Sequence, residues 1–194
     1  MRNERGADDA ERLTKDLSQV LLSAEQIQAM VAALGAAVQR DYDGLHPVLL
    51  GVLKGSVVFL ADLLRQIEIP VEIDFVAAAS YGSSAESSGT IQVRLEPALD
   101  ISGRHVLVIE DIIDTGLTLS KLLATIRERG PASLKVCSLL DKPARRETPL
   151  EPDYVGCEIP DEFVVGYGLD YAERYRNLPC VGVLRREVYE RNVT

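Results

Sequence analysis

The most informative segment of the chain is His105-Val-Leu-Val-Ile-Glu-Asp-Ile-Ile-Asp-Thr-Gly-Leu-Thr-Leu-Ser120. It opens with apolar, mostly β-branched residues, which are typical of a buried strand. Two adjacent carboxylates, Glu110 and Asp111, stand where this strand is expected to end, and a short loop then leads into a helix. A buried strand that continues through a loop into a helix is the unit from which parallel sheets are built.

The loop at residues 114–118 combines hydroxyls, a glycine and small side chains. Its backbone N–H groups can point into one concavity at the positive end of the helix dipole, which predicts a phosphate cradle. A phosphate would be repelled by the acid pair, so we expect Glu110 and Asp111 to bind sugar hydroxyls, a metal ion or both. The alternative is a plain helix start whose acids only complement the dipole.

Strands and helices alternate along the rest of the chain. Apolar strands are expected at 48–53, 71–79, 105–109, 134–140, 163–165 and 180–184. Helices are expected over 56–67, over 119–126 and after Ser23, which forms a capping box with Gln26. Residues 91–95 alternate apolar and polar side chains, as in a half-exposed antiparallel strand. The pattern predicts an α/β fold with a mostly parallel central sheet flanked by helices, whose ligands bind beyond the carboxyl ends of the strands.

Composition limits the possible partners. The formal net charge of the 194 residues is −9, which argues against a surface for nucleic acid or for an anionic membrane. No apolar run is long enough for a membrane span, and the charged residues 1–16 lack a signal-peptide core, so we expect a cytoplasmic protein. We expect residues 1–16 to form a flexible tail and residues 17–194 a single domain.

The cysteines and histidines are expected to be structural. The three cysteines form no C-x-x-C pair and lie in apolar runs, so we expect buried, inert thiols in a reducing compartment. His46 and His105 match no catalytic pattern. The two common nucleotide-binding patterns, G-x-x-x-x-G-K-[ST] and G-x-G-x-x-G, are absent from segments 51–56 and 166–171, which come nearest to them.

Residues 110–120 resemble the phosphoribosyl-diphosphate-binding motif of type I phosphoribosyltransferases. That motif alone leaves orotate, adenine and uracil enzymes open. Further segments resemble the hypoxanthine-guanine branch: Val52-Leu-Lys-Gly-Ser56, Ser80-Tyr-Gly-Ser83, Leu139-Leu-Asp-Lys-Pro143 and Phe163-Val-Val-Gly-Tyr-Gly-Leu-Asp-Tyr171. The resemblance implies the type I phosphoribosyltransferase fold with a small hood and a mobile lid hairpin. It also implies Mg²⁺-dependent transfer of ribose 5-phosphate from 5-phosphoribosyl 1-diphosphate to a 6-oxopurine base.

The resemblance also implies roles for single residues at the sugar. Glu110 and Asp111 would hold the ribose 2- and 3-hydroxyls and would ligate magnesium, and Asp170 would ligate a second magnesium that bridges the diphosphate. Asp114 would face N7 of the purine as general base, although a plain capping aspartate is the alternative. The 5-phosphate would be held by the backbone and hydroxyls of Asp114, Thr115, Gly116, Leu117 and Thr118.

Other residues are implied for the diphosphate and the purine. Lys54 and Gly55 would bind the leaving diphosphate, in a loop whose Leu53–Lys54 peptide bond can be cis in the family. Ser80 and Tyr81 would cover the diphosphate from the lid at residues 80–90, and Arg176 would bind it bidentately. At the purine, the resemblance implies that Lys142 donates to O6 and that the ring of Phe163 stacks on the base. The Val164 backbone would contact the other edge of the base, and Asp170 would supply a metal-binding carboxylate.

Two alternative functions stay open at this level. One is a regulatory module that keeps the phosphoribosyl fold but senses nucleotides or binds RNA. The other is a transferase that prefers xanthine, and residues 158–164 are the place where such a preference would be encoded. Family members are commonly dimers or tetramers, so a homodimer or homotetramer is expected.

Overall fold

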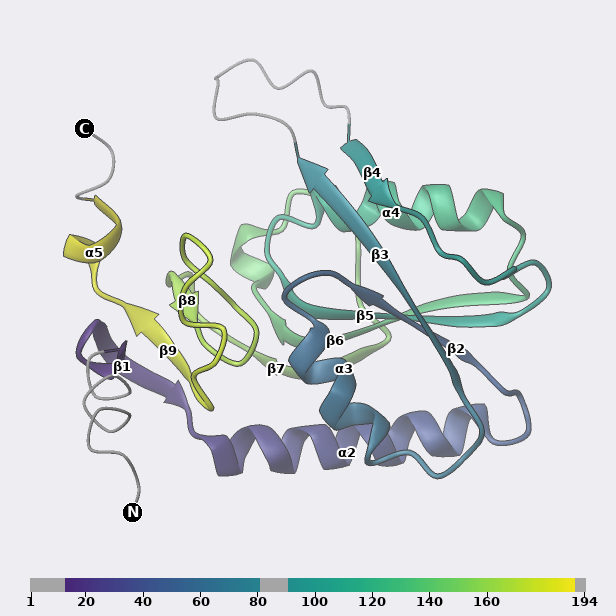
Figure 1. Cartoon of the computed structure of the whole chain (residues 1–194), viewed down its shortest axis with the longest axis horizontal. Helices are drawn as coiled ribbons and strands as arrows, with labels where there is room; N and C mark the ends of the chain where they lie inside the picture. Colours follow the sequence, from purple (N-terminus) through teal and green to yellow (C-terminus); the bar gives the residue numbers. More distant parts are fainter. Residues whose placement is uncertain (1–12, 81–90, 191–194) are drawn as a thin grey trace. The chain divides into compact units, whose positions relative to one another are not determined.

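The computed structural model describes residues 13–80 and 91–190. Its contacts group the chain into two compact units (Figure 1): residues 30–161, here called the sheet unit, and residues 1–29 with 162–194, here called the terminal unit. The expected lid falls on residues 81–90, apart from Ser80 at the end of a strand, and so lies outside the described residues. The prediction of a single domain over 17–194 stays a prediction.

The sheet unit is built on six strands in the order β4-β3-β2-β5-β6-β7. All neighbouring pairs are parallel except β3 and β4, which are antiparallel. The mostly parallel sheet and the antiparallel strand at 91–95 are therefore confirmed. The strands are β2 (Val48–Val52), β3 (Glu72–Ser80), β4 (Ile91–Leu95), β5 (His105–Ile113), β6 (Ser133–Asp141) and β7 (Tyr154–Glu158).

Strand β7 was not predicted from the sequence. Its central Gly156 breaks the apolar run, and glycine is a weak strand former. Packing explains the residue, because a Cβ at Gly156 would lie 2.4 Å from the carbonyl oxygen of Leu139. Close approach to β6 thus requires glycine at a position where the local pattern does not predict a strand.

The helices are α2 (Ala24–Tyr42), α3 (Val57–Leu64) and α4 (Leu117–Glu128). The predicted capping box is present at the start of α2: the Ser23 N–H donates to Gln26 Oε1 at 2.8 Å, and the Gln26 N–H donates to Ser23 Oγ at 3.3 Å. Figure 1 shows α3 and α4 on opposite faces of the sheet. Right-handed crossovers require this, because β2 leads to β3 in one direction and β5 leads to β6 in the other.

The core of the sheet unit follows the alternation of side chains along the strands. Val48, Leu50 and Val52 of β2 contribute to the cluster that contains the apolar face of α4. The predicted helical face is buried as a whole and consists of Leu119, Leu122, Leu123 and Ile126. Gly51 faces the other way, since a Cβ there would lie 2.8 Å from Leu60 of α3. Each fully buried aliphatic side chain contributes about 1.5–3 kcal/mol.

The strand order reverses between β2 and β5. Their following connections run to opposite sides, which leaves a crevice at the carboxyl ends of the two strands. The loop after β2 carries Lys54 and Gly55, and the loop after β5 carries residues 114–118. The topology therefore places both predicted loops at the edge where α/β sheets bind ligands.

The terminal unit contains a three-stranded antiparallel sheet in the order β1-β9-β8, formed by β1 (Leu17–Leu22), β8 (Val164–Val165) and β9 (Val181–Leu184), and a short helix α5 (Arg186–Glu190). Order begins before residue 17. The Tyr175 hydroxyl donates to Asp16 at 2.6 Å, and the Arg185 side chain donates to the Lys15 carbonyl at 3.0 Å. β1 was not predicted, because its partner strand lies more than a hundred residues further along the chain.

The thiols fit the structural role expected for them. Cys137 is fully buried, and burial raises the pKa of its thiol to about 12. Burial also raises the pKa of Cys157 and of Cys180, although both are only partly buried, so full burial was wrong for these two. His105 is held by Ser133, with 2.8 Å between its Nδ1 and the hydroxyl oxygen. Among residues 13–80 and 91–190, no helix is long and apolar enough to cross a membrane.

Candidate active site

Strand β5 runs through the acid pair instead of ending before it. The sequence predicted a strand over 105–109, but β5 continues to Ile113. The extension is explained by β6, which is equally long and pairs Glu110 with Ser138 and Ile113 with Asp141 in parallel register. Glu110 and Asp111 are therefore positioned by the sheet itself and not by a flexible loop.

Glu110 is half-buried, and one oxygen of its carboxylate is incompletely satisfied. Its Oε2 atom is buried without a hydrogen-bond partner. Burial raises the pKa of this carboxyl well above its usual value, and the neighbouring charge of Asp111 raises it further. A buried carboxylate oxygen without a donor is unfavourable, so it requires a hydroxyl or a cation from a ligand.

The loop after β2 packs directly against Asp111. A Cβ at Gly55 would lie 1.7 Å from Asp111 Oδ2, so any larger residue would displace the Asp111 carboxylate. The preceding Leu53–Lys54 peptide bond is cis, and Lys54 is exposed. Asp111 Oδ1 accepts the N–H of Ile112 at 3.0 Å. The structure thus brings the predicted diphosphate loop and the predicted sugar-binding acids together.

The loop at residues 114–118, which the sequence predicts to be a phosphate cradle, leads into α4 through a glycine. Gly116 is the N-cap of α4 with a left-handed φ of 79°, which favours glycine. Thr115 Oγ1 accepts the N–H of Leu117 at 3.4 Å, and the Leu117 side chain is exposed. The first N–H groups of a helix have no partner within the helix, so the start of α4 offers donors to an anion.

Asp114 is flanked by two cations. Arg145 Nε lies 3.0 Å from Asp114 Oδ1, and Lys142 Nζ lies 3.8 Å from Oδ2. Oδ1 has no hydrogen-bond donor aimed at it, so the contact with Arg145 is an ion pair without hydrogen-bond geometry. Arg145 also approaches Asp161, at 3.4 Å. The sequence analysis did not identify Arg145, although its place just after Lys142 at the ligand edge was a usable signal.

Lys142, the expected donor to the purine O6, is held in place by its backbone and is largely buried. It directly follows β6, its backbone N–H donates to the Ile113 carbonyl at 2.9 Å, and only 5% of the residue is exposed. Lysine is rarely buried without a partner, and the nearby Asp114 carboxylate supplies the opposite charge. The sheet unit therefore brings together Gly55, Glu110, Asp111, Asp114 and Lys142.

The remaining predicted residues belong to the terminal unit and are described by themselves. Phe163 is 41% exposed, and its ring stacks on Tyr189 of α5 at 5.1 Å between centroids. Tyr171 meets Phe163 edge-on at 5.7 Å. Val164 is buried in β8. The sequence analysis did not identify Tyr189.

Asp170 and Arg176 pair with each other. Arg176 Nη2 lies 2.8 Å from Asp170 Oδ1, and Nη1 donates to the Gly168 carbonyl at 2.7 Å. Asp170 Oδ2 also accepts the N–H of Glu173 at 2.9 Å. Ser80 ends strand β3, and Tyr81 lies outside the described residues.

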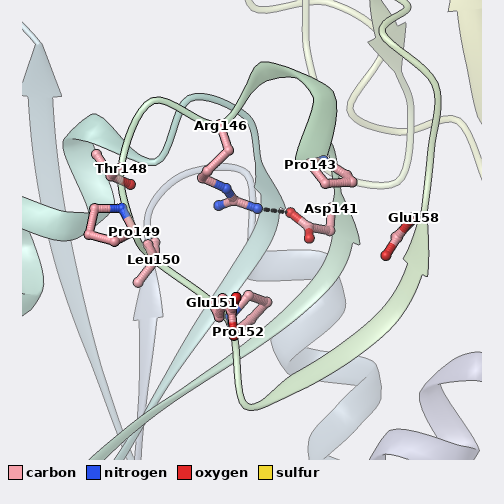
Figure 2. Close-up of a pocket in the computed structure, with 9 residues that line it drawn as sticks. All are labelled: Asp141, Pro143, Arg146, Thr148, Pro149, Leu150, Glu151, Pro152 and Glu158. Carbon is pink, nitrogen blue, oxygen red and sulfur yellow. Dashed lines mark hydrogen bonds and ion pairs between the residues drawn. The ribbon is translucent and has the colours of Figure 1, made fainter.

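The sheet unit also contains a cavity that the sequence did not predict (Figure 2). Its volume is about 350 Å³. Arg146 pairs with Asp141 at its wall. It is lined by Asp141, Pro143, Arg146, Thr148, Pro149, Leu150, Glu151, Pro152 and Glu158. Neither acid of the pair lines it, but Glu158 falls in the segment 158–164 that was expected to encode a preference for xanthine.

The acid pair also fits a magnesium ion. In the part of the chain that the structure describes, no group of three or more His, Cys, Asp or Glu side chains is placed to hold a metal. Glu110 and Asp111 offer oxygen atoms, one of them buried and unpartnered. Magnesium prefers oxygen ligands, and in nucleotide and sugar-phosphate sites it commonly takes one or two carboxylates and fills its shell with substrate oxygens and water.

A crevice at the switch point, a half-buried acid pair in β5 and a helix that starts at a glycine are features of α/β proteins that bind a sugar phosphate. A family model described as "Phosphoribosyl transferase domain" matches residues 20–172. A hypoxanthine-guanine phosphoribosyltransferase of Bacillus subtilis is 50% identical over 175 residues, which cover 90% of this chain and 97% of that protein. One of Streptococcus pneumoniae is 49% identical over 177 residues, which cover 91% and 98%. The chain therefore belongs to the phosphoribosyltransferase family, in its hypoxanthine-guanine branch.

Solved structures agree with this assignment. A hypoxanthine phosphoribosyltransferase of Staphylococcus aureus is 46% identical and matches with a TM-score of 0.88, over 91% of this chain and 96% of that one. A hypoxanthine-guanine phosphoribosyltransferase of Bacillus anthracis is 47% identical and matches with a TM-score of 0.83, over 87% and 99%. The family and the fold class expected from the sequence are confirmed.

Proposed function

We propose that the chain transfers ribose 5-phosphate from 5-phosphoribosyl 1-diphosphate to N9 of hypoxanthine or guanine. The products are IMP or GMP and diphosphate, as in purine salvage. The observation that carries the proposal is the buried, unpartnered Oε2 of Glu110, next to Asp111, whose carboxylate packs against Gly55 in the loop after β2. The names of the similar proteins support the same activity.

The sugar end of the reaction depends on the sheet. The reaction is a substitution at the anomeric carbon with a cation-like transition state, so the two carboxylates gain attraction as positive charge develops on the sugar. Glu110 and Asp111 accept hydrogen bonds from the ribose 2- and 3-hydroxyls, which would satisfy the unpartnered oxygen. Residues 114–118 hold the 5-phosphate by their backbone N–H groups and by the hydroxyls of Thr115 and Thr118.

The purine end depends on Asp114 and Lys142. Asp114 takes the proton from N7 as N9 attacks the sugar, and Lys142 donates to O6. A donor at this position favours an oxo group over the exocyclic amine of adenine. The 3.8 Å approach of Lys142 to Asp114 keeps the proposed base and the proposed selectivity residue together. Phe163 is assigned to stacking on the purine, and the Val164 backbone is assigned to its other edge.

Magnesium is assigned to the carboxylates Glu110, Asp111 and Asp170. When bound, the ion would neutralise charge on the departing diphosphate. The diphosphate itself is assigned to Lys54, Gly55, Ser80, Tyr81 and Arg176. By analogy with the family we also propose a homodimer or homotetramer in the cytoplasm that uses small-molecule substrates, since a net charge of −9 disfavours nucleic acid and anionic membranes.

Competitive turnover with hypoxanthine, guanine and xanthine, and with adenine as control, tests this function. We expect the first two bases to be used and adenine to be rejected. Lys142→Ala should lose preference for hypoxanthine over adenine while it keeps its affinity for the diphosphate sugar. Preference for xanthine would replace the proposed substrates. Absence of turnover with every base, together with retention on heparin at low salt, would support the regulatory alternative instead.

A further inference from the structure

The segment that follows β6 is fastened to the loop at residues 114–118. Its first residue, Lys142, donates its N–H to the Ile113 carbonyl at 2.9 Å. Five residues later, Glu147 donates its N–H to the Thr115 carbonyl at 2.9 Å. These two backbone hydrogen bonds attach the segment 142–148 to the chain on both sides of Asp114.

Arg146 lies in the middle of this attachment. Its guanidinium pairs with Asp141, the last residue of β6 (Figure 2), and the two side chains are only 13% and 10% exposed. Its Nη1 atom is buried without a hydrogen-bond partner, and so is Thr148 Oγ1. Breaking a buried ion pair is unfavourable, because the partner that remains is a buried charge without compensation. The pair with Asp141 therefore keeps the Arg146 guanidinium in this position.

Both side chains press against Gly116. A Cβ at that glycine would lie 2.5 Å from Thr148 Oγ1, 3.2 Å from Arg146 Cδ and 3.4 Å from Arg146 Nη1. Gly116 is the left-handed N-cap of α4, and its conformation directs the N–H groups that begin the helix. Arg146 and Thr148 therefore occupy the space next to Gly116 and leave no room for a side chain there.

We propose that Arg146 is a positioning residue for 5-phosphate binding, and that Thr148 acts with it as a support behind Gly116. The proposal rests on the proposed function, which assigns the 5-phosphate to residues 114–118. The ion pair with Asp141 fixes the guanidinium of Arg146 at the end of β6, and the Glu147–Thr115 backbone bond holds the same segment against the loop at residues 114–118. Recognition of a nucleotide over its nucleoside then depends on a side chain that does not touch the ligand.

The test compares inosine 5′-monophosphate with inosine, which lacks only the phosphate. Titration calorimetry measures the nucleotide and ligand-observed NMR the nucleoside, each with wild type and Arg146→Met. Methionine keeps the apolar stem and removes the ion pair. We expect affinity for the nucleotide to fall about tenfold or more, as when outer contacts that orient binding groups are removed, with affinity for inosine unchanged. Arg129→Met is the matched control, because Arg129 pairs with Glu96 at the other end of α4.

A second comparison does not depend on Arg146→Met folding. Gly116→Ala should weaken nucleotide binding, and adding Thr148→Ala should recover part of the loss, because it removes the oxygen that the new Cβ meets. Recovery is partial, since a φ of 79° strains alanine in either background.

The possible results separate the two ideas. A wild-type protein that binds neither ligand and turns over no base overturns the proposed function. A wild type that binds the nucleotide, with Arg146→Met unchanged or equally impaired for both ligands, overturns the positioning role. Strictly additive losses in the Gly116 and Thr148 variants overturn the support by Thr148.

Discussion

At the scale of single residues, the carboxylates of the sheet unit occupy different surroundings. Glu110 lies within strand β5, with one oxygen buried and unpartnered. Asp114 follows the strand, and its side chain is 42% exposed between Arg145 and Lys142. Both acids have one buried oxygen without a hydrogen-bond donor, but only Asp114 has cations beside it, and its exposed side leaves it accessible to a bound base.

Replacement of Asp114 tests the proposed base. Asp114→Asn keeps the size of the side chain but cannot take the proton from N7, so turnover should fall by about 10²–10⁴-fold. Affinity for 5-phosphoribosyl 1-diphosphate should change little, because the backbone of the cradle is intact. Steady-state kinetics and direct binding measure the two effects. A change in turnover of less than about threefold would show that Asp114 is not the base. The capping role considered from the sequence is wrong, because Gly116, and not Asp114, is the N-cap of α4.

Replacement of Glu110 tests how much stability the fold loses by burying a carboxylate oxygen without a hydrogen-bond partner. The pKa of Glu110 is raised in the folded protein, so the folded form loses stability as pH rises from the usual carboxyl value of 4.5 towards the raised one. Glu110→Gln removes this loss. We expect the variant to be more stable than wild type by about 1 kcal/mol at pH 8, with a smaller difference at pH 5.

Urea unfolding at the two pH values measures that difference. The same variant should bind the diphosphate sugar more weakly, because an amide is a poorer acceptor for sugar hydroxyls than a carboxylate. Thr125→Val, on the exposed side of α4, is the control, and its effect on the free energy of unfolding should be the same at both pH values. A less stable Glu110→Gln at pH 8 would contradict the reasoning.

At the scale of elements, packing between neighbours explains the departures from the sequence prediction. β5 extends through Ile113 because β6 supplies a partner along its whole length. β1 forms because β9 is available, although residues 17–22 carry no strong strand pattern of their own. α5 is short and has no buried residue, but its Tyr189 reaches the ring of Phe163.

The contact between α5 and Phe163 leads to a prediction about purine binding. Tyr189→Ala removes the ring that stacks on Phe163, so the proposed stacking residue should be less well oriented. An aromatic pair contributes about 0.5–1.5 kcal/mol, which corresponds to a rise in purine KM of roughly two- to tenfold. Tyr189→Phe keeps the ring and should leave the KM unchanged. Equal KM values for the alanine variant and wild type would show that the stack is only structural.

At the scale of the whole molecule, the proposed metal ligands are divided between the two units. Glu110 and Asp111 belong to the sheet unit and Asp170 to the terminal unit. The described residues contain no group of three or more side chains able to hold a metal, so the proposed ion needs oxygens of the substrate. Metal binding should therefore depend on the diphosphate sugar.

Removal of metal tests this dependence. Activity should require magnesium, vanish in excess chelator and return when magnesium is added. Zinc should substitute poorly, because the proposed ligands are all oxygen atoms. Calorimetry should detect tight magnesium binding only when the diphosphate sugar is present. Full activity in excess chelator would rule out the assignment of Glu110, Asp111 and Asp170 to a metal.

The amino-acid sequence alone was sufficient for the features that arise within a few neighbouring residues. The capping box of Ser23 and Gln26, the buried face of α4 and the acid pair beside a glycine-containing loop all depend on local spacing. Local spacing also indicates a mostly parallel sheet, because buried strands alternate with helices. The family and most of the candidate residues came instead from the resemblance of segments such as 110–120 to a known family.

Contacts between distant segments required the tertiary structure. Gly55 meets Asp111 because the strand order reverses between β2 and β5, and Arg146 reaches Gly116 because the segment after β6 bends back over the loop after β5. Arg145 stands beside Asp114 for the same reason. Such contacts join residues about thirty to sixty positions apart, so no local pattern of side chains encodes them. They depend on which strands become neighbours, and the packing of the whole sheet determines that choice.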